Sequence, residues 1–522
     1  MKRSNLYFSF IFLVFIFFAS SDTLDAQERR PNIIVFLVDD MGWMDTSVPF
    51  GDSVMALNRI YRTPNMERLA REGMKFTNAY ATPVCTPTRV SLLTGMNAAH
   101  HRVTNWTNVM KDRPSDAEDK QFNRTDWNYN GYSPVPNVPH TAYATALPQI
   151  LKDAGYFTVH VGKAHWGAQG TPGANPLNLG FMVNVAGNAI GHPQSYYGKD
   201  NYGNIPGKFS YNAVQGLAEY YGSDTFLTEA LTLEALKSID QPAKSKQPFY
   251  LHLAHYAIHV PMQADVRFVQ KYYDMGLDSA EAKYASLIEG MDKSLGDVMD
   301  YLEENGLEKN TIILFMSDNG GLSLTSFRGG EAHTQNLPLR AGKGSVYEGG
   351  IREPMIVKWP GVVKANTRNH QPLIIEDFFP SILEMAKISK PKLLQQVDGV
   401  SFVPLLKGAK FMHDNRSLIW HYPHKWTPQD GPGINYFSAI RRGKWKLVYD
   451  YRRETLELYN LSEDLGEQVN LVRQQTGIAT QLAAELTDQL KKWGALMPTT
   501  KESNKAVAWP DVILKQMNSK LK

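Results

Sequence analysis

The sequence predicts an α/β fold: a large central sheet, mixed but mostly parallel, is covered by helices, and a small C-terminal α+β subdomain with a short antiparallel sheet follows it. Three observations support this prediction. Apolar runs of strand length end abruptly in polar residues, as expected for strands that are buried on both faces. Segments with helical spacing of apolar residues lie between those runs. From about Ser417 the pattern changes to short strand-like segments separated by charged turns.

The strands of the large sheet are expected at residues 31–38, 156–161, 248–254 and 311–316. Covering helices are expected at residues 142–154, 224–237, 281–305 and 374–386. In the subdomain, two segments resemble antiparallel strands, residues 438–449 and 456–461, and residues 478–493 are expected to form a helix that packs on them. Residues 111–140, rich in Asp, Asn and Pro, are expected to form a long loop.

Residues 1–21 have the features of a signal peptide. Lys2 and Arg3 precede an apolar stretch, residues 6–18, that is too short for a comfortable membrane span. The expected units after it are a large domain at 28–410, a subdomain at 411–500 and a tail at 501–522. No later segment is apolar enough to cross a bilayer, so we expect a protein exported to the periplasm or secreted. An uncleaved membrane anchor is the alternative.

The formal net charge of +3 over 522 residues argues against a general polyanion-binding surface, and hence against nucleic acid as a partner. An anionic ligand would have to be recognised by a local pocket. The 25 Tyr and 10 Trp residues supply stacking surfaces of the kind that sugar sites use.

Cys85 is the only cysteine, so no intramolecular disulfide can form. Pro87 suits the first turn of a helix, residues 90–93 continue it, and Gly95 suits its end. Cys85 is therefore expected at a helix N-terminus, where free N–H groups favour an anion, with Arg89 one turn further on the same face. These neighbours favour reactive chemistry or covalent modification. A buried structural cysteine is the alternative.

Candidate metal ligands follow two of the expected strands. Asp39 and Asp40 come directly after residues 31–38, and Asp318 and Asn319 follow residues 311–316. Open α/β sheets bind ligands at the carboxyl edge of their strands, and hard oxygen donors suit Ca²⁺ or Mg²⁺. Solvated turn residues are the alternative for either pair taken alone.

Candidate cations and bases follow the other strands. Lys163 and His165 come after residues 156–161, and His259 comes after residues 248–254. A glycine-dense loop at residues 342–352 is able to bring Lys343 close to a ligand. Each of these residues is unremarkable alone, but their expected convergence at one edge of the sheet favours a functional site there.

With these motifs the chain resembles the formylglycine-dependent (type I) sulfatases of the alkaline-phosphatase-like superfamily, over nearly the whole mature chain. The most specific element is Cys85-Thr86-Pro87-Thr88-Arg89, which a formylglycine-generating maturation enzyme reads in that family. The resemblance extends through residues 32–40, 92–95, 162–165, 317–320, 342–343, 348–352, 458–461 and 470–471. Ala164 and Trp166 depart from the family pattern, and this departure is expected to concern substrate shape.

The resemblance implies that Cys85 is oxidised to formylglycine (3-oxoalanine), whose hydrated aldehyde attacks the sulfur of a sulfate ester and is regenerated when sulfate is eliminated. It implies a bound Ca²⁺, with Mg²⁺ as the alternative, held by Asp39, Asp40, Asp318, Asn319 and the modified Cys85. Arg89 would orient the formylglycine, and Lys163 and Lys343 would bind sulfate oxygens. His259, alone or with Lys343, would be the general acid and His165 the base, although which histidine has which role stays open. His252 and His255 are expected to be structural.

The expected substrate is a sulfated carbohydrate. Beside Lys163, His259 and Lys343, its binding is expected to involve His101, Arg102, Asn105 and Trp106, with His100, His192, His421 and His424 as further candidates. Residues 100–106 resemble the corresponding cluster of sulfatases that act on galactose-type sugars. The sugar, the sulfate position, exo or endo action and the oligomeric state stay open.

Two other functions stay open. A phosphodiesterase or phosphonate hydrolase of the same superfamily would need a second set of metal ligands, which is not evident in the sequence, whereas fixed cations at Lys163 and Lys343 suit a sulfate. A non-catalytic binder of sulfated glycans would have no need of an intact Cys85 with its neighbouring histidines.

Overall fold

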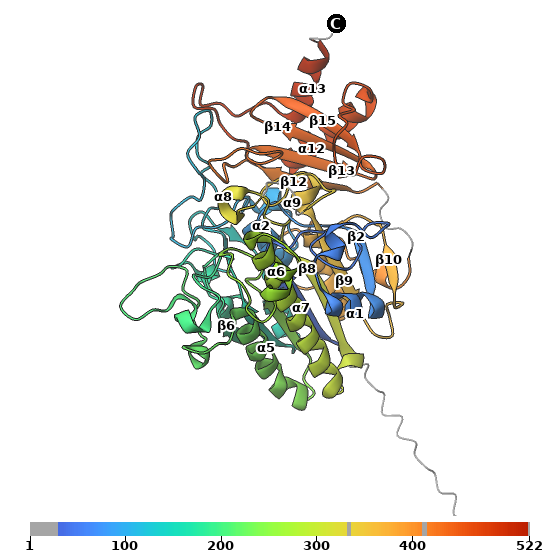
Figure 1. Ribbon diagram of the computed structural model, residues 1–522. Coiled ribbons are helices and arrows are strands. Elements are labelled where there is room, and N and C mark those ends of the chain that lie inside the picture. Colours follow the sequence, from blue (N-terminus) through green and yellow to red (C-terminus); the bar gives the residue numbers. More distant parts are fainter. Residues whose placement is uncertain (1–29, 331–335, 410–414, 520–522) are drawn as a thin grey trace, which may run out of the picture.

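The computed structural model describes residues 30–330, 336–409 and 415–519. The predicted signal peptide and the domain boundary predicted near residue 410 lie outside the described residues. Figure 1 shows a larger part built around the central sheet and a smaller part, coloured orange to red, that contains β12 to β15 and adjoins one end of the larger part.

The large sheet has nine strands in the order β10-β2-β9-β8-β1-β7-β5-β6, with β11 pairing to β2. β9 is antiparallel to both of its neighbours, and every other pair is parallel. The mixed, mostly parallel sheet is therefore confirmed. Its strands are β1 (Asn32–Val38), β2 (Met74–Tyr80), β5 (Phe157–Gly162), β6 (Val183–Val185), β7 (Phe249–Ala254), β8 (Thr311–Ser317), β9 (Arg352–Lys358), β10 (Thr367–Asn369) and β11 (Leu373–Ile374).

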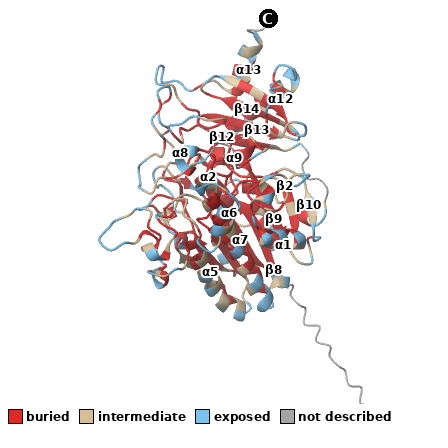
Figure 2. Cartoon of the chain, viewed as in Figure 1, coloured by how far each residue is buried: buried red, intermediate tan, exposed pale blue. Residues whose placement is uncertain are grey.

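Helices cover both faces of this sheet. Successive residues of β1 alternate between two cores: Ile33 and Val35 face one, while Ile34 and Phe36 face the other. Figure 2 shows the strands as buried and the outer faces of the helices as exposed. The first core includes residues of α2 (Cys85–Thr94), α4 (Leu147–Asp153) and α10 (Phe378–Met385), and the second those of α1 (Pro64–Glu72), α5 (Leu227–Lys244), α6 (Val269–Asp274) and α7 (Ser279–Glu304). Because both faces are covered, the strands are continuously apolar.

The predicted covering helices are all present, but two are shorter than expected: α10 begins at Phe378 rather than at residue 374, because residues 373–374 form β11. α4 begins at Leu147 rather than at residue 142, and residues 142–143 instead form β4 (Ala142–Tyr143), which pairs with β3 (Tyr132–Ser133). Pro148 explains the difference, because proline lacks an N–H donor and its ring clashes with the preceding turn, so it is tolerated only in the first turn of a helix.

The small part is an antiparallel sheet in the order β12-β13-β14-β15, packed against α12 (Thr476–Lys492). Its strands are β12 (Ser417–Tyr422), β13 (Phe437–Arg442), β14 (Trp445–Asp450) and β15 (Thr455–Asn460). The predicted tail, residues 501–522, contains α13 (Pro510–Ser519), whose Ile513 and Leu514 are buried in the same core. The subdomain therefore extends beyond residue 500, because this amphipathic segment covers apolar surface that would otherwise be exposed.

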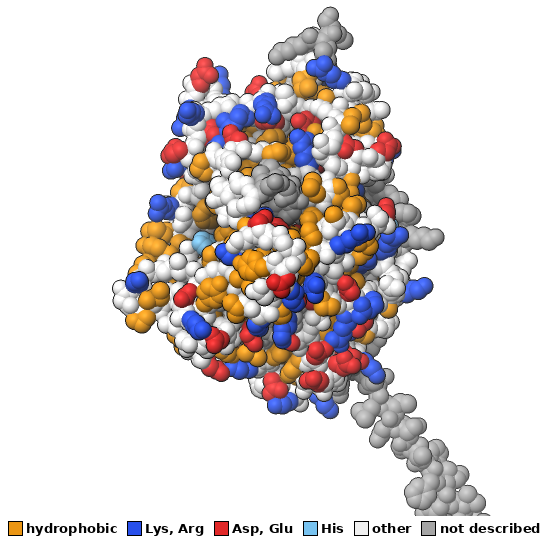
Figure 3. Space-filling model, viewed as in Figure 1, with side chains coloured by type: hydrophobic (Ala, Val, Ile, Leu, Met, Phe, Trp, Pro, Cys, Tyr) orange, Lys and Arg blue, Asp and Glu red, His pale blue; other side chains and the backbone are white. Residues whose placement is uncertain are grey.

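Short helices complete the structure: α3 (Ala98–His101), α8 (Thr325–Arg328), α9 (Glu348–Ile351) and α11 (Val403–Leu406). Within the described residues, no helix combines the length and the apolar character that a membrane crossing requires. Acidic and basic side chains are interspersed over the face shown in Figure 3, in keeping with the near-neutral net charge.

Candidate active site

The candidate residues come together at one edge of the large sheet. β5, β7, β1 and β8 are consecutive parallel strands whose last residues are in register, with Gly162 opposite Ala254 and Val38 opposite Ser317. The segments that follow these strands therefore leave the sheet at the same edge. They carry Lys163 and His165 after β5, His259 after β7, Asp39 and Asp40 after β1, and Asp318 and Asn319 after β8.

Cys85 is the first residue of α2, and only 4% of its surface is exposed. The preceding residue, Val84, has no side-chain oxygen to cap the helix, so the positive end of the helix faces the region around Cys85. The imidazole Nδ1 of His165 lies 3.4 Å from the Cys85 Sγ atom. The predicted helix start at Cys85 and its end before Gly95 agree with the structure.

Three buried cations face three buried carboxylates behind Cys85. Arg89 donates from Nε and Nη2 to Asp318 Oδ2 at 2.9 and 2.7 Å. Lys163 Nζ lies 2.6 Å from Asp39 Oδ2, and Lys343 Nζ lies 2.6 Å from Asp40 Oδ1. In addition to burial, all three cations are near enough to His165 to lower its pKa. In a region of low dielectric such fixed positive charges act strongly on an anion.

The carboxylates and Asn319 have the arrangement that a divalent cation needs. Asp39 Oδ1 and Asn319 Oδ1 are buried and have no hydrogen-bond partner among the described residues, while the Asn319 amide Nδ2 donates to Asp40 Oδ1 at 2.8 Å. Burial, reinforced by the nearby Asp318, raises the pKa of Asp39 well above its usual value. A bound cation would partner both free oxygens and relieve the repulsion between carboxylates, so the residues fit Ca²⁺ or Mg²⁺.

The two histidines differ in the nitrogen that each presents. His165 Nε2 lies 2.7 Å from the carbonyl oxygen of Thr107, which only accepts, so Nε2 carries the proton. The unprotonated Nδ1 lies beside Cys85 Sγ and 3.3 Å from the Thr86 hydroxyl, from both of which it can accept. His259 Nδ1 lies 3.1 Å from the Val260 carbonyl oxygen, and its Nε2 faces Asp40 Oδ2 at 3.7 Å. Burial lowers the pKa of both histidines well below the usual value. The charge of Lys163 lowers the pKa of His165 further, and the charge of Lys343 lowers that of His259 further.

A cavity of about 570 Å³ opens onto this cluster. Its lining includes Cys85, His165, His259 and Lys343 together with aromatic side chains from distant parts of the chain, namely Trp106, Tyr211, Phe327 and Trp426. The indole Nε1 of Trp106 is buried and has no hydrogen-bond partner among the described residues. Polar groups at one end and aromatic walls are typical of a small-molecule site. We call this the active cavity.

His259 and Lys343 line the active cavity, and of the further residues that the sequence suggested for sugar binding, Trp106 and His192 line it as well. His101 is buried and its Nε2 lies 3.0 Å from Ser91 Oγ, while the Asn105 side chain bonds to Asp116 and Tyr422. Arg102 lies beside Gly494 of the small part. His100, His421 and His424 also hydrogen-bond elsewhere, to Asp398, Ser438 and Thr104 respectively. The structure thus gives no support to a substrate contact for these six residues.

Some lining residues were absent from the sequence prediction. Thr107 orients His165 through its carbonyl oxygen, and Tyr211, Phe327 and Trp426 form walls of the active cavity. Phe327 lies in the short helix α8 and the other three lie in loops, all without a motif, so no sequence signal marks them. His252 and His255, expected to be structural, are buried in the core, where His252 contacts Tyr250 OH and His255 contacts Ser294 Oγ.

Comparison with known proteins identifies the family. Residues 31–388 match the model of the sulfatase family, and residues 342–495 match the model described as N-sulphoglucosamine sulphohydrolase, C-terminal. The chain is 32% identical to N-acetylgalactosamine-6-sulfatase of Mus musculus, over 83% of this chain and 82% of the relative. It is 29% identical to a sulfatase of Formosa agariphila, over 94% of both chains. The crystal structure of Ps i-CgsB is similar with a TM-score of 0.68 and 26% identity, over 94% of this chain and 97% of that one.

The family match covers the strand ends and the helix that build the cluster around Cys85, and the sequence relatives span most of the chain. The chain belongs to the type I sulfatase family and is a sulfuric ester hydrolase.

Proposed function

We propose that the protein removes sulfate from a sulfated carbohydrate, with a galactose-type sugar in the active cavity, through a formylglycine made from Cys85. The observation that carries this proposal is that Cys85 lines the active cavity together with His165 and Lys343, next to the buried Arg89 and Lys163. The carbohydrate class is supported by relatives named N-acetylgalactosamine-6-sulfatase and by the aromatic walls of the active cavity.

The chain's own residues would divide the work as follows. Lys343 and Lys163 bind the non-bridging oxygens of the sulfate and stabilise the charge that develops on them. Arg89 fixes Asp318 and also donates to the Lys163 carbonyl oxygen at 2.7 Å, which holds this group in place. His165, kept neutral by its lowered pKa, presents Nδ1 toward residue 85 as a base. His259 and Lys343, which both line the active cavity, are the candidates for the acid that protonates the leaving oxygen.

Two groups complete the site. Formylglycine supplies the attacking hydroxyl, and a cation held by Asp39, Asp40, Asp318 and Asn319 supplies positive charge next to it. Residues 85–89 are all buried in the folded chain. The maturation enzyme would therefore have to act on this segment before folding is complete. We also propose that the protein undergoes this maturation and is exported to the periplasm or the medium.

The proposal is tested on the protein from its native host. The tryptic peptide of residues 76–89 should be about 18 Da lighter than its cysteine form, because sulfur and two hydrogens are replaced by one oxygen. Sulfate release should be measured over a panel of sulfated monosaccharides and oligosaccharides, with a phosphodiester for comparison. Cys85→Ala should abolish turnover and leave the melting temperature nearly unchanged. An unmodified cysteine with full activity, or faster turnover of the phosphodiester, would refute the proposal.

A further inference from the structure

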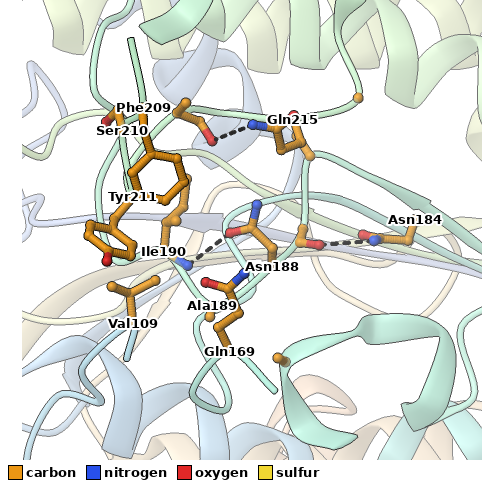
Figure 4. Close-up of a pocket in the computed structure, with 15 residues that line it drawn as sticks. Val109, Gln169, Asn184, Asn188, Ala189, Ile190, Phe209, Ser210, Tyr211 and Gln215 are labelled. Carbon is orange, nitrogen blue, oxygen red and sulfur yellow. Dashed lines mark hydrogen bonds between the residues drawn. The ribbon is translucent and has the colours of Figure 1, made fainter. Parts of the chain in front are cut away.

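A second cavity, of about 430 Å³, adjoins the active cavity. Figure 4 shows the side chains around it, with Phe209 and Tyr211 on one side and the amides of Gln169 and Asn188 near the centre of the view. We call it the amide cavity. None of the described residues that line it is Asp, Glu, Lys, Arg or His. In contrast, the active cavity is lined by Arg113, Lys343 and three histidines.

The two cavities share part of their lining. Val109 and Tyr211 line both. Residues 186–190 line the amide cavity, and the next two residues, Gly191 and His192, line the active cavity. The backbone carbonyl oxygen of Asn188 accepts a hydrogen bond of 3.0 Å from the backbone N–H of His165. The two cavities therefore lie side by side, as the binding of two linked sugar residues requires.

The amide cavity offers hydrogen-bonding groups that are not used within the protein. The exposed Gln169 side chain makes no hydrogen bond to the described residues. Asn188 uses its Oδ1 atom to accept from the Ile190 N–H at 2.8 Å, which leaves its NH₂ group available (Figure 4). Neutral amides both donate and accept, as recognition of sugar hydroxyls requires.

The aromatic pair at this cavity is exposed to an unusual degree. Phe209 is 80% exposed and Tyr211 is 48% exposed, and their rings meet edge to face with centroids 4.6 Å apart. Exposed apolar surface of this kind beside a cavity is typical of a ligand-binding surface. The C–H face of a sugar ring would cover it, whereas a charged group would lose solvation there without gaining a cation.

We propose that the amide cavity binds an uncharged sugar residue that is linked to the sulfated sugar in the active cavity. The enzyme would accordingly prefer a sulfated oligosaccharide to the sulfated monosaccharide. This inference rests on the proposed function, because it assumes that a sulfated sugar occupies the active cavity.

The test uses the double variant Gln169→Ala/Phe209→Ala, since neither residue lines the active cavity. Three substrates carry the same sulfated galactose-type unit: the free monosaccharide, its disaccharide with galactose, and its disaccharide with glucuronic acid. The wild type should have the highest kcat/KM on the galactose disaccharide. The double variant should lose about tenfold in kcat/KM on that substrate, mainly through KM, and should match the wild type on the monosaccharide.

Tyr273→Ala is the control, because Tyr273 is an exposed aromatic residue on α6 that lines neither cavity. It should behave as the wild type on all three substrates. An equal loss on monosaccharide and disaccharide, no loss on the galactose disaccharide, or a preference for the glucuronic acid disaccharide would overturn the inference.

If the proposed function itself were wrong, the result would be distinguishable, because the wild type would then release no sulfate from any of the three substrates. Calorimetric titration with unsulfated galactobiose would in that case test the amide cavity alone. Binding that the double variant abolishes would support an uncharged sugar site, and no binding by the wild type would overturn it.

Discussion

Arg89 shows how one side chain organises the candidate site. Its planar guanidinium contacts Asp318 with two nitrogens and the Lys163 carbonyl oxygen with the third. The side chain is fully buried, and although burial acts to lower its pKa, Asp318 and Asp39 outweigh this effect and raise it. Arg89 therefore stays charged and links the segment after β8 to the segment after β5. A lysine cannot reproduce this fork of three donors.

We therefore predict that Arg89→Lys lowers kcat by about 100-fold, because Asp318 and Lys163 lose their fixed positions. It should also reduce the melting temperature, since a buried acceptor is left unsatisfied. Sulfate release and thermal denaturation measure the two effects. Arg68→Lys is the matched control, because Arg68 pairs with Asp300 and Glu303 at the surface. Wild-type activity of Arg89→Lys would contradict the role described here.

Among the elements, α2 places Cys85 and is fixed by its C-terminal end. Gly95 follows the helix with a φ of +71°, a left-handed conformation that glycine adopts readily. A Cβ atom at this position would lie 2.9 Å from ring atoms of Phe379 on α10. The close packing of these two helices against the sheet holds the start of α2 at the active cavity.

Gly95→Ala should cost about 2–3 kcal/mol in stability, since left-handed strain adds to a clash with a packed ring. Gly306→Ala is the control: Gly306 also has a positive φ, of +63°, but faces open space, so about 1 kcal/mol is expected. Thermal denaturation of both variants under one set of conditions provides the comparison. Equal losses would show that Phe379 moves aside without cost.

At the scale of the whole molecule, buried charges join the two parts. Lys446 on β14 lies 2.9 Å from Glu348 of α9 and 2.9 Å from Glu467, and all three side chains are fully buried. Burial raises the pKa of Glu467 to about 7, although Lys446 opposes this. The Trp420 indole Nε1 also donates to the Ala81 carbonyl oxygen at 2.8 Å across the same junction.

Lys446→Met should destabilise the protein by about 3–5 kcal/mol, because it leaves the buried Glu467 without a cation and leaves Glu348 with Arg352 alone. Lys444→Met, on the same hairpin but exposed, should change stability by less than about 0.5 kcal/mol. Thermal denaturation followed by tryptophan fluorescence would report both, since Trp420 lies at the junction. A Lys446→Met protein as stable as the Lys444→Met protein would contradict the structural role of the ion cluster.

Stability should also depend on pH through Glu376, which precedes α10 and accepts a hydrogen bond from Asn97. Burial, with a contribution from Asp377, raises its pKa from 4.5 to about 8. The folded state therefore binds the proton more tightly than the unfolded state, and the stability that this provides is present below pH 4.5 and is lost as pH rises toward 8.

Glu376→Gln removes this titration and retains the acceptor for Asn97. We expect it to match the wild type near pH 5 and to become progressively more stable than the wild type up to pH 8, by at most about 5 kcal/mol. Melting temperatures across this range measure the difference. Glu384→Gln, an exposed change on α10, should show no such trend. A constant difference between Glu376→Gln and the wild type would refute the assignment.

The sequence by itself determined the elements and the residues that bear the chemistry. Apolar runs that end in Asp39 or Asp318 specify strands buried on both faces, and Pro87 and Gly95 bound a helix, because these are local preferences of backbone and side chain. The convergence of four strand ends was also expected, since parallel strands of one sheet present their carboxyl ends at one edge, although the spatial order β8-β1-β7-β5 is a property of the tertiary structure.

Only the tertiary structure decided which residues surround the ligand. His101 and Trp106 are five residues apart, yet one bonds to Ser91 in the interior and the other lines the active cavity. Tyr211 and Trp426 reach the active cavity from loops far away in the chain, and most residues that line the amide cavity lie in loops. Loop positions depend on contacts between distant segments, which leave no periodic pattern in the sequence.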